Sequence, residues 1–415
     1  MHVEILSIGD ELLIGQTVNT NAAWMGEQLL QIGVVPDWVT TVGDNADRLF
    51  SAMRVAEERA DIVLLTGGLG PTHDDITKAV ACRFFSSDTV LDETVLQAIR
   101  ERFARRGIPM ARINEEQAQV PRNARVIPND RGTAPGMIFT ENNKRFYIMP
   151  GVPFEMQSMM QRVVLPELVR LLGAKNIETR TLATTGIAES TLFAELGDMK
   201  KLEASARVAF LPSLCGVRIR LTATADRTTG AVEKLNRAEN WIRERVGDFI
   251  YANRDIGLEA VLADELIRSG KTVAVAESCT GGLLASRLTD IPGSSNYFMQ
   301  GVVAYSNKAK HEVVGVPQEL LEKHGAVSRA VAEALAEGIR GTAKTTFGLA
   351  VTGIAGPGGS TAQKPVGLVY IACAEEGATV VEEHRFADDR LGNKMRTAQA
   401  ALNLLRKSLF NLHIK

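Results

Sequence analysis

The stretch Ala276-Glu277-Ser278-Cys279-Thr280-Gly281-Gly282 decides the fold of the C-terminal part of the chain. An apolar run, residues 272–276, leads into it, and an amphipathic run, residues 283–288, leads out. This order predicts a strand, a tight turn and a helix. The turn places three possible nucleophiles and two glycines at a helix N-terminus. Unpaired backbone N–H groups at such a place can hold a phosphate or a developing oxyanion.

The bulk properties of the chain predict a globular protein of several domains. Its 415 residues suggest two or three domains, and 45% hydrophobic with 23% charged residues is typical of a soluble fold. The formal net charge is −2, so no basic excess is present to bind nucleic acid. Small anionic ligands remain possible, because local backbone sites bind them without net charge.

The cysteines and the N-terminus predict a cytoplasmic protein. No Cys-x-x-Cys pair occurs, which argues against a zinc ribbon or a redox pair and suits a reducing compartment. The first residues lack a basic segment followed by an apolar one, and we find no apolar run long enough to span a bilayer. The four cysteines are Cys82, Cys215, Cys279 and Cys373.

Alternating strand and helix patterns predict an α/β protein of three domains. We place these domains at residues 1–171, 172–253 and 254–415. The first alternates like a parallel sheet covered by helices, and the second is small, with strand, helix, strand and helix in order. Strands are expected at residues 3–8, 34–42, 62–65, 137–140, 145–149, 180–184, 217–223, 272–276, 301–305, 348–351 and 366–374. Helices are expected at residues 21–32, 46–60, 76–85, 92–107, 190–202, 230–246 and 391–409.

Three strand ends of the third domain carry polar or small residues. They are residues 278–282, 304–310 and 351–359. In open α/β sheets, ligands gather at the carboxyl ends of parallel strands. We therefore expect these segments to form one shared site.

A serine hydroxyl in this site needs a base before it can attack a carbonyl. Histidine is scarce near these turns, so a lysine is the simplest candidate for the general base. Lys308 follows Tyr305 by three residues, and both point the same way if a helical turn starts there. The alternatives remain open at this point: Ser278 can be a helix cap, Cys279 and Tyr305 can be packing residues, Thr352 can satisfy a local backbone group, and Lys308 can be a solvated charge.

The motifs Ala-Glu-Ser-Cys-Thr-Gly-Gly, Ala-Tyr-Ser-Asn-Lys and Thr-Gly-Ile-Ala-Gly-Pro resemble the C-terminal domain of the CinA family. That family includes nicotinamide mononucleotide deamidases, which form nicotinate mononucleotide and ammonia in pyridine-nucleotide salvage. The resemblance implies Ser278 as nucleophile, Tyr305 and Lys308 as its activators, Thr352 at the site, and no cofactor. It also implies substrate contacts from Cys279, Thr280, Gly281, Gly282, Asn307, Gly353, Gly356, Arg390 and Arg396, although the two arginines can equally lie on an exposed helix face.

In the first domain, a glycine-rich turn at residues 66–71 follows a strand and opens a helix, so it can hold a phosphate. It is not a P-loop, because the glycine–lysine–hydroxyl ending is missing. Asp74 and Asp75 beside it can bind a divalent cation, or can simply favour a first helical turn.

This domain resembles the molybdopterin-binding fold found at the N-terminus of full-length CinA proteins. The resemblance implies a metal-dependent ADP-ribose pyrophosphatase. The implied phosphate contacts are Gly67, Gly68 and Gly70. The polar candidates are Asp10, Glu11, Asn19, Asp74, Asp75 and Glu155, of which all but Asn19 are possible ligands of the cation.

The middle domain resembles the small KH-like connecting domain of the same family. It lacks a basic Gly-x-x-Gly loop, so we expect no nucleic-acid binding. The resemblance also implies a homodimer and no membrane partner. Two alternatives stay open for the N-terminal domain: molybdopterin binding with adenylyl transfer, or a non-catalytic nucleotide-sensing role.

Overall fold

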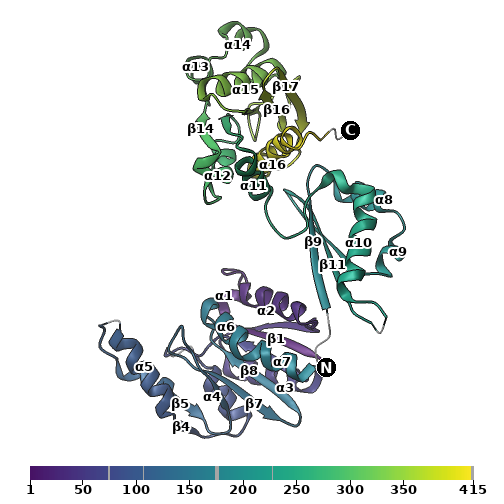
Figure 1. Ribbon diagram of the computed structural model, residues 1–415. Coiled ribbons are helices and arrows are strands. Elements are labelled where there is room, and N and C mark those ends of the chain that lie inside the picture. Colours follow the sequence, from purple (N-terminus) through teal and green to yellow (C-terminus); the bar gives the residue numbers. More distant parts are fainter. Residues whose placement is uncertain (73–74, 106, 173–176, 227, 413–415) are drawn as a thin grey trace. The chain divides into compact units, whose positions relative to one another are not determined.

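The structure is a computed structural model in which the chain divides into two compact units, described separately here (Figure 1). The first unit is Met1–Ile177 with Thr224–Thr228, and the second is Glu178–Ala223 with Thr229–Lys415. The residues that the structure describes are 1–72, 75–105, 107–172, 177–226 and 228–412.

The first unit is built on a six-stranded sheet. Its strands are β1 Val3–Ile8, β2 Trp38–Val42, β3 Ile62–Thr66, β6 Arg125–Ile127, β7 Gly136–Glu141 and β8 Lys144–Met149. They are ordered β2-β1-β3-β8-β7-β6; the first four run parallel, and β7 and β6 run antiparallel to their neighbours. All residues of β1 and β3 are buried, as expected for parallel strands that are covered on both faces.

Helices cover both faces of this sheet. One core contains Met25, Leu29 and Met156, and the other contains Leu49 and Val80. Short turns follow the carboxyl ends of β1 and β3 and lead into the next helices. The helices are α1 Asp10–Leu13, α2 Thr20–Gln31, α3 Ala46–Arg59, α4 Thr77–Phe84, α6 Pro153–Met159 and α7 Leu165–Leu172, with a π-helical turn at Met160–Val164 between the last two.

A small lobe extends this unit beside the sheet. It holds its own apolar cluster, formed by Leu96, Ile99 and Ala118. The lobe consists of β4 Thr89–Leu91, α5 Glu93–Arg105, 3₁₀ turns at Arg112–Asn114 and Glu116–Ala118, and β5 Gln119–Pro121.

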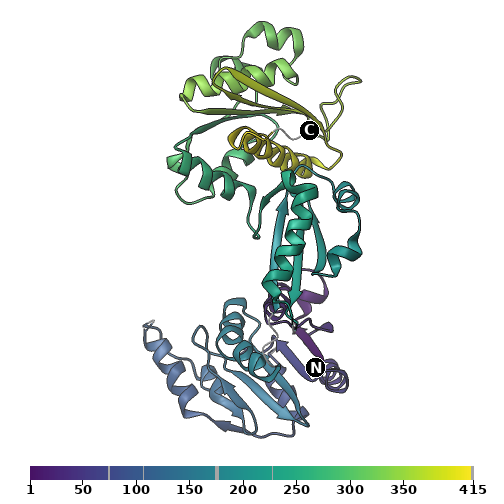
Figure 2. The same cartoon turned by 45° about the vertical axis from the view of Figure 1, so that its right-hand side comes forward.

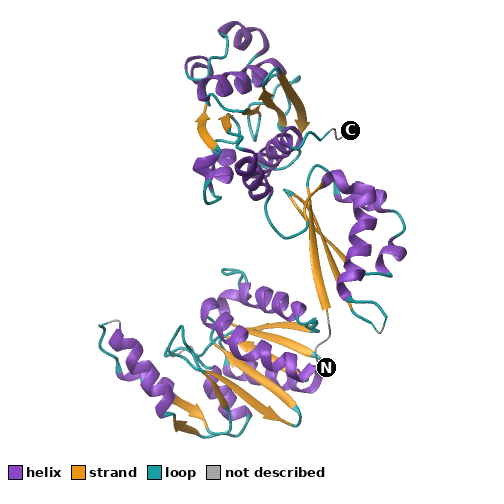
Figure 3. Cartoon of the chain, viewed as in Figure 1, coloured by secondary structure: helices purple, strands orange, loops and turns teal. Residues whose placement is uncertain are grey.

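The second unit begins with a four-stranded sheet in the order β10-β11-β9-β12. Figure 3 shows its helices on one face of the sheet. The edge strand β10 is absent from the sequence prediction, because its residues are mostly half-buried or exposed and show no clean alternation. The elements are β9 Ile177–Thr184, α8 Glu189–Leu196, α9 Met199–Glu203, β10 Arg207–Ser213, β11 Gly216–Thr224, α10 Ala231–Val246, a 3₁₀ turn at Gly247–Phe249 and β12 Ile250–Ala252.

The C-terminal part of this unit contains a five-stranded sheet. Its strands are β13 Val273–Glu277, β14 Phe298–Val303, β15 Phe347–Gly353, β16 Leu368–Glu375 and β17 Ala378–Arg385. Their order is β14-β13-β15-β16-β17; the first three are parallel and the last two antiparallel. The carboxyl ends of β13, β14 and β15 therefore meet at one edge, as the sequence predicts.

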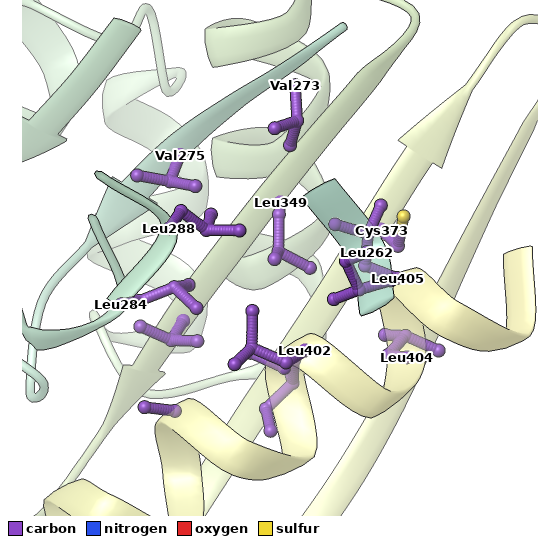
Figure 4. Packing of buried hydrophobic residues seen from close by; sticks show 14 of the residues in the cluster. Leu262, Val273, Val275, Leu284, Leu288, Leu349, Cys373, Leu402, Leu404 and Leu405 are labelled. Atoms are coloured by element: carbon purple, nitrogen blue, oxygen red, sulfur yellow. The ribbon is translucent and has the colours of Figure 1, made fainter. Parts of the chain in front are cut away.

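Helices also cover both faces of this sheet, as Figure 2 shows for α16 on one side and the green helices on the other. In Figure 4, Leu284, Leu288, Leu402 and Leu405 pack among the strand side chains, including Val275. Burial of each such leucine contributes about 1.5–3 kcal/mol. The helices are α11 Leu258–Ser269, α12 Leu283–Thr289, α13 Asn307–Glu312, α14 Gln318–His324, α15 Arg329–Ala343 and α16 Arg390–Leu409, with a 3₁₀ turn at Ser294–Asn296.

No helix in the described part of the chain combines the length and apolar character needed to cross a membrane. The prediction of a multi-domain α/β protein is confirmed.

Candidate active site at the end of strand β13

Ser278 begins a tight turn between β13 and α12. Its backbone N–H donates to the Val351 carbonyl at 3.0 Å, which ties the turn to the neighbouring strand β15. Gly281 and Gly282 adopt φ values of 61° and 96°, a region that glycine enters without steric cost. These two consecutive left-handed residues explain why the motif ends in a glycine pair.

The Ser278 hydroxyl lies against the amine of Lys310. Lys310 Nζ is 3.1 Å from Ser278 Oγ, 2.7 Å from the Ala304 carbonyl oxygen and 3.0 Å from the Tyr305 carbonyl oxygen. The residue is only 1% exposed. The Ser278 hydroxyl thus has a lysine partner, while the start of α12 receives no side-chain cap from a serine.

This environment favours a neutral amine on Lys310. Burial lowers the pKa of Lys310, and the structure places no carboxylate against it among the described residues. A neutral amine has two N–H groups, which match the two carbonyl acceptors from Ala304 and Tyr305. Its lone pair is then available for the Ser278 O–H, the geometry that a general base requires.

The expectation that Lys308 contacts Ser278 is wrong. The Lys308 side chain is 79% exposed, and its amine lies 3.9 Å from Glu312. The helix does not start at Tyr305: Ser306 caps it by accepting from the Ala309 N–H, and α13 begins at Asn307. Residues two apart on a helix point about 200° apart, so Lys310 faces inward and Lys308 faces solvent.

The other two possible nucleophiles of the turn, Cys279 and Thr280, are buried. Burial raises the pKa of the Cys279 thiol to about 12, so this thiol stays protonated. The Thr280 hydroxyl is fully buried and finds no hydrogen-bond partner in the described chain. No oxygen atom of the described residues accepts from the backbone N–H of Cys279 or Thr280; only the weakly accepting Cys279 sulfur lies beside them. These two N–H groups are the donors that remain for an oxyanion.

Glu277 occupies the start of helix α12. Its buried carboxylate accepts from the N–H groups of Gly282 at 3.0 Å, Leu284 at 3.0 Å and Ala285 at 2.8 Å. A carboxylate at a helix N-terminus satisfies donors that otherwise lack partners and interacts favourably with the helix dipole. The expectation that the Gly281-Gly282 backbone holds a phosphate is therefore corrected, because the chain itself fills that site.

Glu277→Gln is expected to destabilise the second unit by about 1–3 kcal/mol, because one acceptor oxygen becomes an amide that faces N–H donors. Calorimetric unfolding of the purified protein measures this as a lower transition temperature. Glu376→Gln removes an exposed carboxylate from a turn elsewhere in the same unit and serves as control. An unchanged transition in Glu277→Gln would show that the carboxylate does not hold the helix.

The structure places the other predicted residues near this edge in different roles. Tyr305 is 61% exposed, and it meets Lys310 through its carbonyl rather than its ring. Thr352 is fully buried and donates to the Ala326 carbonyl at 2.7 Å. Asn307 is exposed at the first position of α13. None of these three side chains contacts Ser278 in the structure.

The two predicted arginines differ. Arg390 donates to the Gly356 carbonyl at 2.6 Å and lies 3.3 Å from the Tyr305 hydroxyl, so it reaches the site. Arg396 pairs with Asp388, so its charge is already compensated. Gly353 is packed closely against β16, where an added Cβ would lie 2.8 Å from the Leu368 oxygen. Gly353 therefore serves strand packing.

Sequence reasoning missed Lys394. Its Nζ is 3.6 Å from the position that a Cβ on Gly281 would occupy, which places it over the nucleophile turn. The available signal was its spacing of four residues from Arg390 on the same helix, because such residues share a face.

The first unit has a second polar strand end, at Gly67-Gly68. Gly68 has φ 63°, and the backbone N–H groups of Gly68, Leu69 and Gly70 find no acceptor among the described residues. The buried hydroxyl of Thr77, at the start of α4, also has no hydrogen-bond partner among the described residues, and the same holds for the Ser7 hydroxyl on β1. An added Cβ on Gly68 would lie 2.4 Å from Thr77 Oγ1. These unpaired donors suit an anionic ligand.

The acidic residues predicted to bind a cation do not converge within the described chain. Asp10 exchanges hydrogen bonds with Asp44, Asp75 accepts from Thr72, and Glu155 accepts from Asn129 at 2.6 Å. Glu11 is exposed, Asn19 caps α2, and Asp74 lies outside the described residues. No group of three or more potential ligand side chains occurs among the described residues. Binding of a divalent cation thus stays a prediction, because Asp74 lies outside the described residues.

Three family models match the chain in succession. Residues 4–170 match a probable molybdopterin binding domain, residues 179–252 match the KH domain of damage-inducible protein CinA, and residues 255–409 match the CinA C-terminal domain. The chain is thus a multi-domain protein with a molybdopterin-binding-like fold, a KH-like module and a CinA domain.

Several relatives share this organisation. A CinA-like protein of Dictyoglomus thermophilum is 42% identical over 412 residues, which cover 99% of this chain and 100% of that protein. A CinA-like protein of Salinibacter ruber is 43% identical over 411 residues, with the same coverage. The competence/damage inducible protein CihA of Agrobacterium tumefaciens, a solved structure, is 42% identical, covers 37% of this chain and 97% of its own, and has a TM-score of 0.36. The chain belongs to the CinA family, which confirms the resemblance.

Proposed function

We propose that this protein hydrolyses the carboxamide of nicotinamide mononucleotide to nicotinate mononucleotide and ammonia, in pyridine-nucleotide salvage. The observation that carries the proposal is the 3.1 Å contact between Lys310 Nζ and Ser278 Oγ, in a buried setting where no described carboxylate pairs with the amine. A neutral amine beside a hydroxyl at the end of a strand is a nucleophile–base pair suited to acyl transfer. The choice of nicotinamide mononucleotide as the substrate comes from the resemblance to the CinA family.

The reaction proceeds in two balanced halves. Lys310 takes the Ser278 proton while Oγ attacks the amide carbon, and the N–H groups of Cys279 and Thr280 stabilise the oxyanion. The Lys310 ammonium then protonates the leaving nitrogen, so the C–N bond breaks and ammonia departs. Water attacks the resulting ester, with its proton passing to Lys310 and then back to Ser278 Oγ. This scheme uses no metal.

The test is product identity. Purified full-length protein is incubated with nicotinamide mononucleotide, and ammonia and nicotinate mononucleotide are measured by a coupled assay and by mass spectrometry. Equimolar formation of both products supports the proposal. Release of free nicotinamide, or no turnover across neutral and alkaline pH, would contradict it.

We propose a second activity for the first unit, cleavage of ADP-ribose at the Gly67-Gly68 turn. The supporting observation is the run of N–H groups at residues 68–70 that lack an acceptor among the described residues, beside the buried hydroxyl of Thr77. A pyrophosphate is the anionic group that such a turn can bind. Dependence on a divalent cation remains a prediction, tested by adding Mg²⁺ or a chelator to the same assay.

Gly68→Ala is expected to reduce ADP-ribose hydrolysis at least about 10-fold, because the new Cβ meets Thr77 Oγ1 at 2.4 Å and displaces the turn. Gly15→Ala is the matched control: its φ is also positive, at 73°, but no atom lies within 4 Å. Equal losses in both variants would point to backbone strain alone. Binding of molybdopterin without ADP-ribose hydrolysis would favour the adenylyl-transfer alternative, and ligand binding without any product would favour a sensing role.

A further inference from the structure

The nucleotide's phosphate needs a binding place other than the start of α12. Three of the N–H groups there already donate to Glu277, as described above. Adding a phosphate would place a second anion beside a buried carboxylate, which is unfavourable. The anion must therefore be held by side-chain cations close to the Ser278 turn.

Lys394 is the cation that lies over this turn. Its Nζ is 3.6 Å from the Cβ position of Gly281, and the Gly281 N–H donates to the Ser278 carbonyl at 3.2 Å. Within the described parts of the chain, Lys394 has neither a carboxylate partner nor a hydrogen-bond acceptor. It is half-buried, so its charge is less screened than that of a surface lysine.

Arg390 lies one helical turn before Lys394 on α16. The Gly356 carbonyl and the Tyr305 hydroxyl hold its guanidinium, and no described carboxylate pairs with it. Because residues four apart share a helix face, both cations are presented on the same side of α16. Arg396, by contrast, is neutralised by Asp388.

We propose that Lys394 and Arg390 form an anion subsite that receives the substrate's phosphate and makes the amidase select a pyridine mononucleotide over its riboside. This rests on the function proposed for Ser278. Lys394 is a specificity residue here: it touches the phosphate and takes no part in the proton transfers at Lys310.

The first experiment compares nicotinamide mononucleotide with nicotinamide riboside, which lacks the phosphate. Lys394→Met is expected to lower kcat/KM for the mononucleotide about 10- to 100-fold, mostly through KM, and to leave the riboside within about 2-fold. Lys394→Arg is expected to retain most of the preference. Lys323→Met, which removes an exposed lysine from α14, is the matched control and is expected to match the wild type. Equal losses on both substrates, or no loss on either, would overturn the subsite.

A second experiment separates the subsite from the proposed reaction. Line broadening of inorganic phosphate is followed by phosphorus NMR in the Gly68→Ala background, which weakens phosphate binding in the first unit. We expect Lys394→Met to reduce the broadening at least about 5-fold relative to the same background without it. If the wild type releases no ammonia from either substrate, the proposed function fails, and this measurement alone decides the subsite. Unchanged broadening would then reject it.

Discussion

Ser278→Ala is expected to reduce ammonia release from nicotinamide mononucleotide by at least about 1,000-fold, because the variant has no hydroxyl to form the acyl-enzyme. The change removes one oxygen from a partly buried turn whose backbone contacts remain, including the N–H of residue 278 to the Val351 carbonyl. We therefore expect the fold to be unaffected. Initial rates of ammonia formation, with circular dichroism of the same samples, measure both effects.

The matched control for this variant is Ser286→Ala. Ser286 is an exposed serine on α12, a few residues after the nucleophile turn. Full activity in Ser286→Ala with loss in Ser278→Ala assigns the effect to the nucleophile. Turnover of Ser278→Ala within about 10-fold of the wild type would remove Ser278 from its role and leave direct attack by water as the mechanism.

Lys310→Met is expected to lower kcat about 100- to 10,000-fold, the usual contribution of a general base. Methionine keeps much of the apolar volume of the buried stem but has no proton acceptor of comparable basicity. Lys308→Met is the direct comparison, because the Lys308 side chain is 79% exposed and its amine lies beside Glu312. We expect its activity to equal that of the wild type. Loss in Lys308→Met with activity retained in Lys310→Met would reverse the assignment of the base.

The same lysine sets the pH dependence of kcat. Burial lowers the pKa of Lys310, and only the neutral amine can accept the Ser278 proton. Activity should therefore rise with pH through this lowered pKa and fall as acid protonates the amine. The residual activity of Lys310→Met should not show this loss of activity in acid. If the wild type and Lys310→Met lose activity over the same acidic pH range, a group other than Lys310 causes that loss.

The apolar strands and the polar residues that follow them were sufficient to predict that three segments meet at one edge of the sheet. Three buried strands with polar residues at their carboxyl ends indicated one shared edge, and β13, β14 and β15 do run parallel. The residue at which helix α13 begins was harder to predict from the sequence. Its start depends on Ser306, whose side chain accepts from Ala309 and shifts the inward position to Lys310. An N-cap serine is a readable signal, but Lys308 at three residues from Tyr305 gave a competing pattern.

Other features depend on contacts between residues that sequence spacing does not reveal. The pairing of Arg396 with Asp388 and the position of Lys394 over Gly281 depend on how α16 docks against the β13–α12 turn. The edge strands β10 and β17 escaped prediction because many of their residues are exposed or half-buried, so no clear apolar period marks them. Of the acids predicted for the first unit, Asp10, Asp75 and Glu155 have local hydrogen-bond partners that sequence spacing did not indicate.

The Glu277 carboxylate at the start of α12 gives the turn between β13 and α12 a property that ligand-dependent loops lack. Where the amides of a glycine-rich loop are satisfied only by a bound anion, departure of that anion leaves them unpaired and the loop free to rearrange. Here Glu277 accepts from the N–H groups of Gly282, Leu284 and Ala285 without any ligand, so these three amides do not depend on substrate binding. The start of α12 should thus keep its position without substrate, so that the reaction proposed at Ser278 begins from a turn that is already largely ordered.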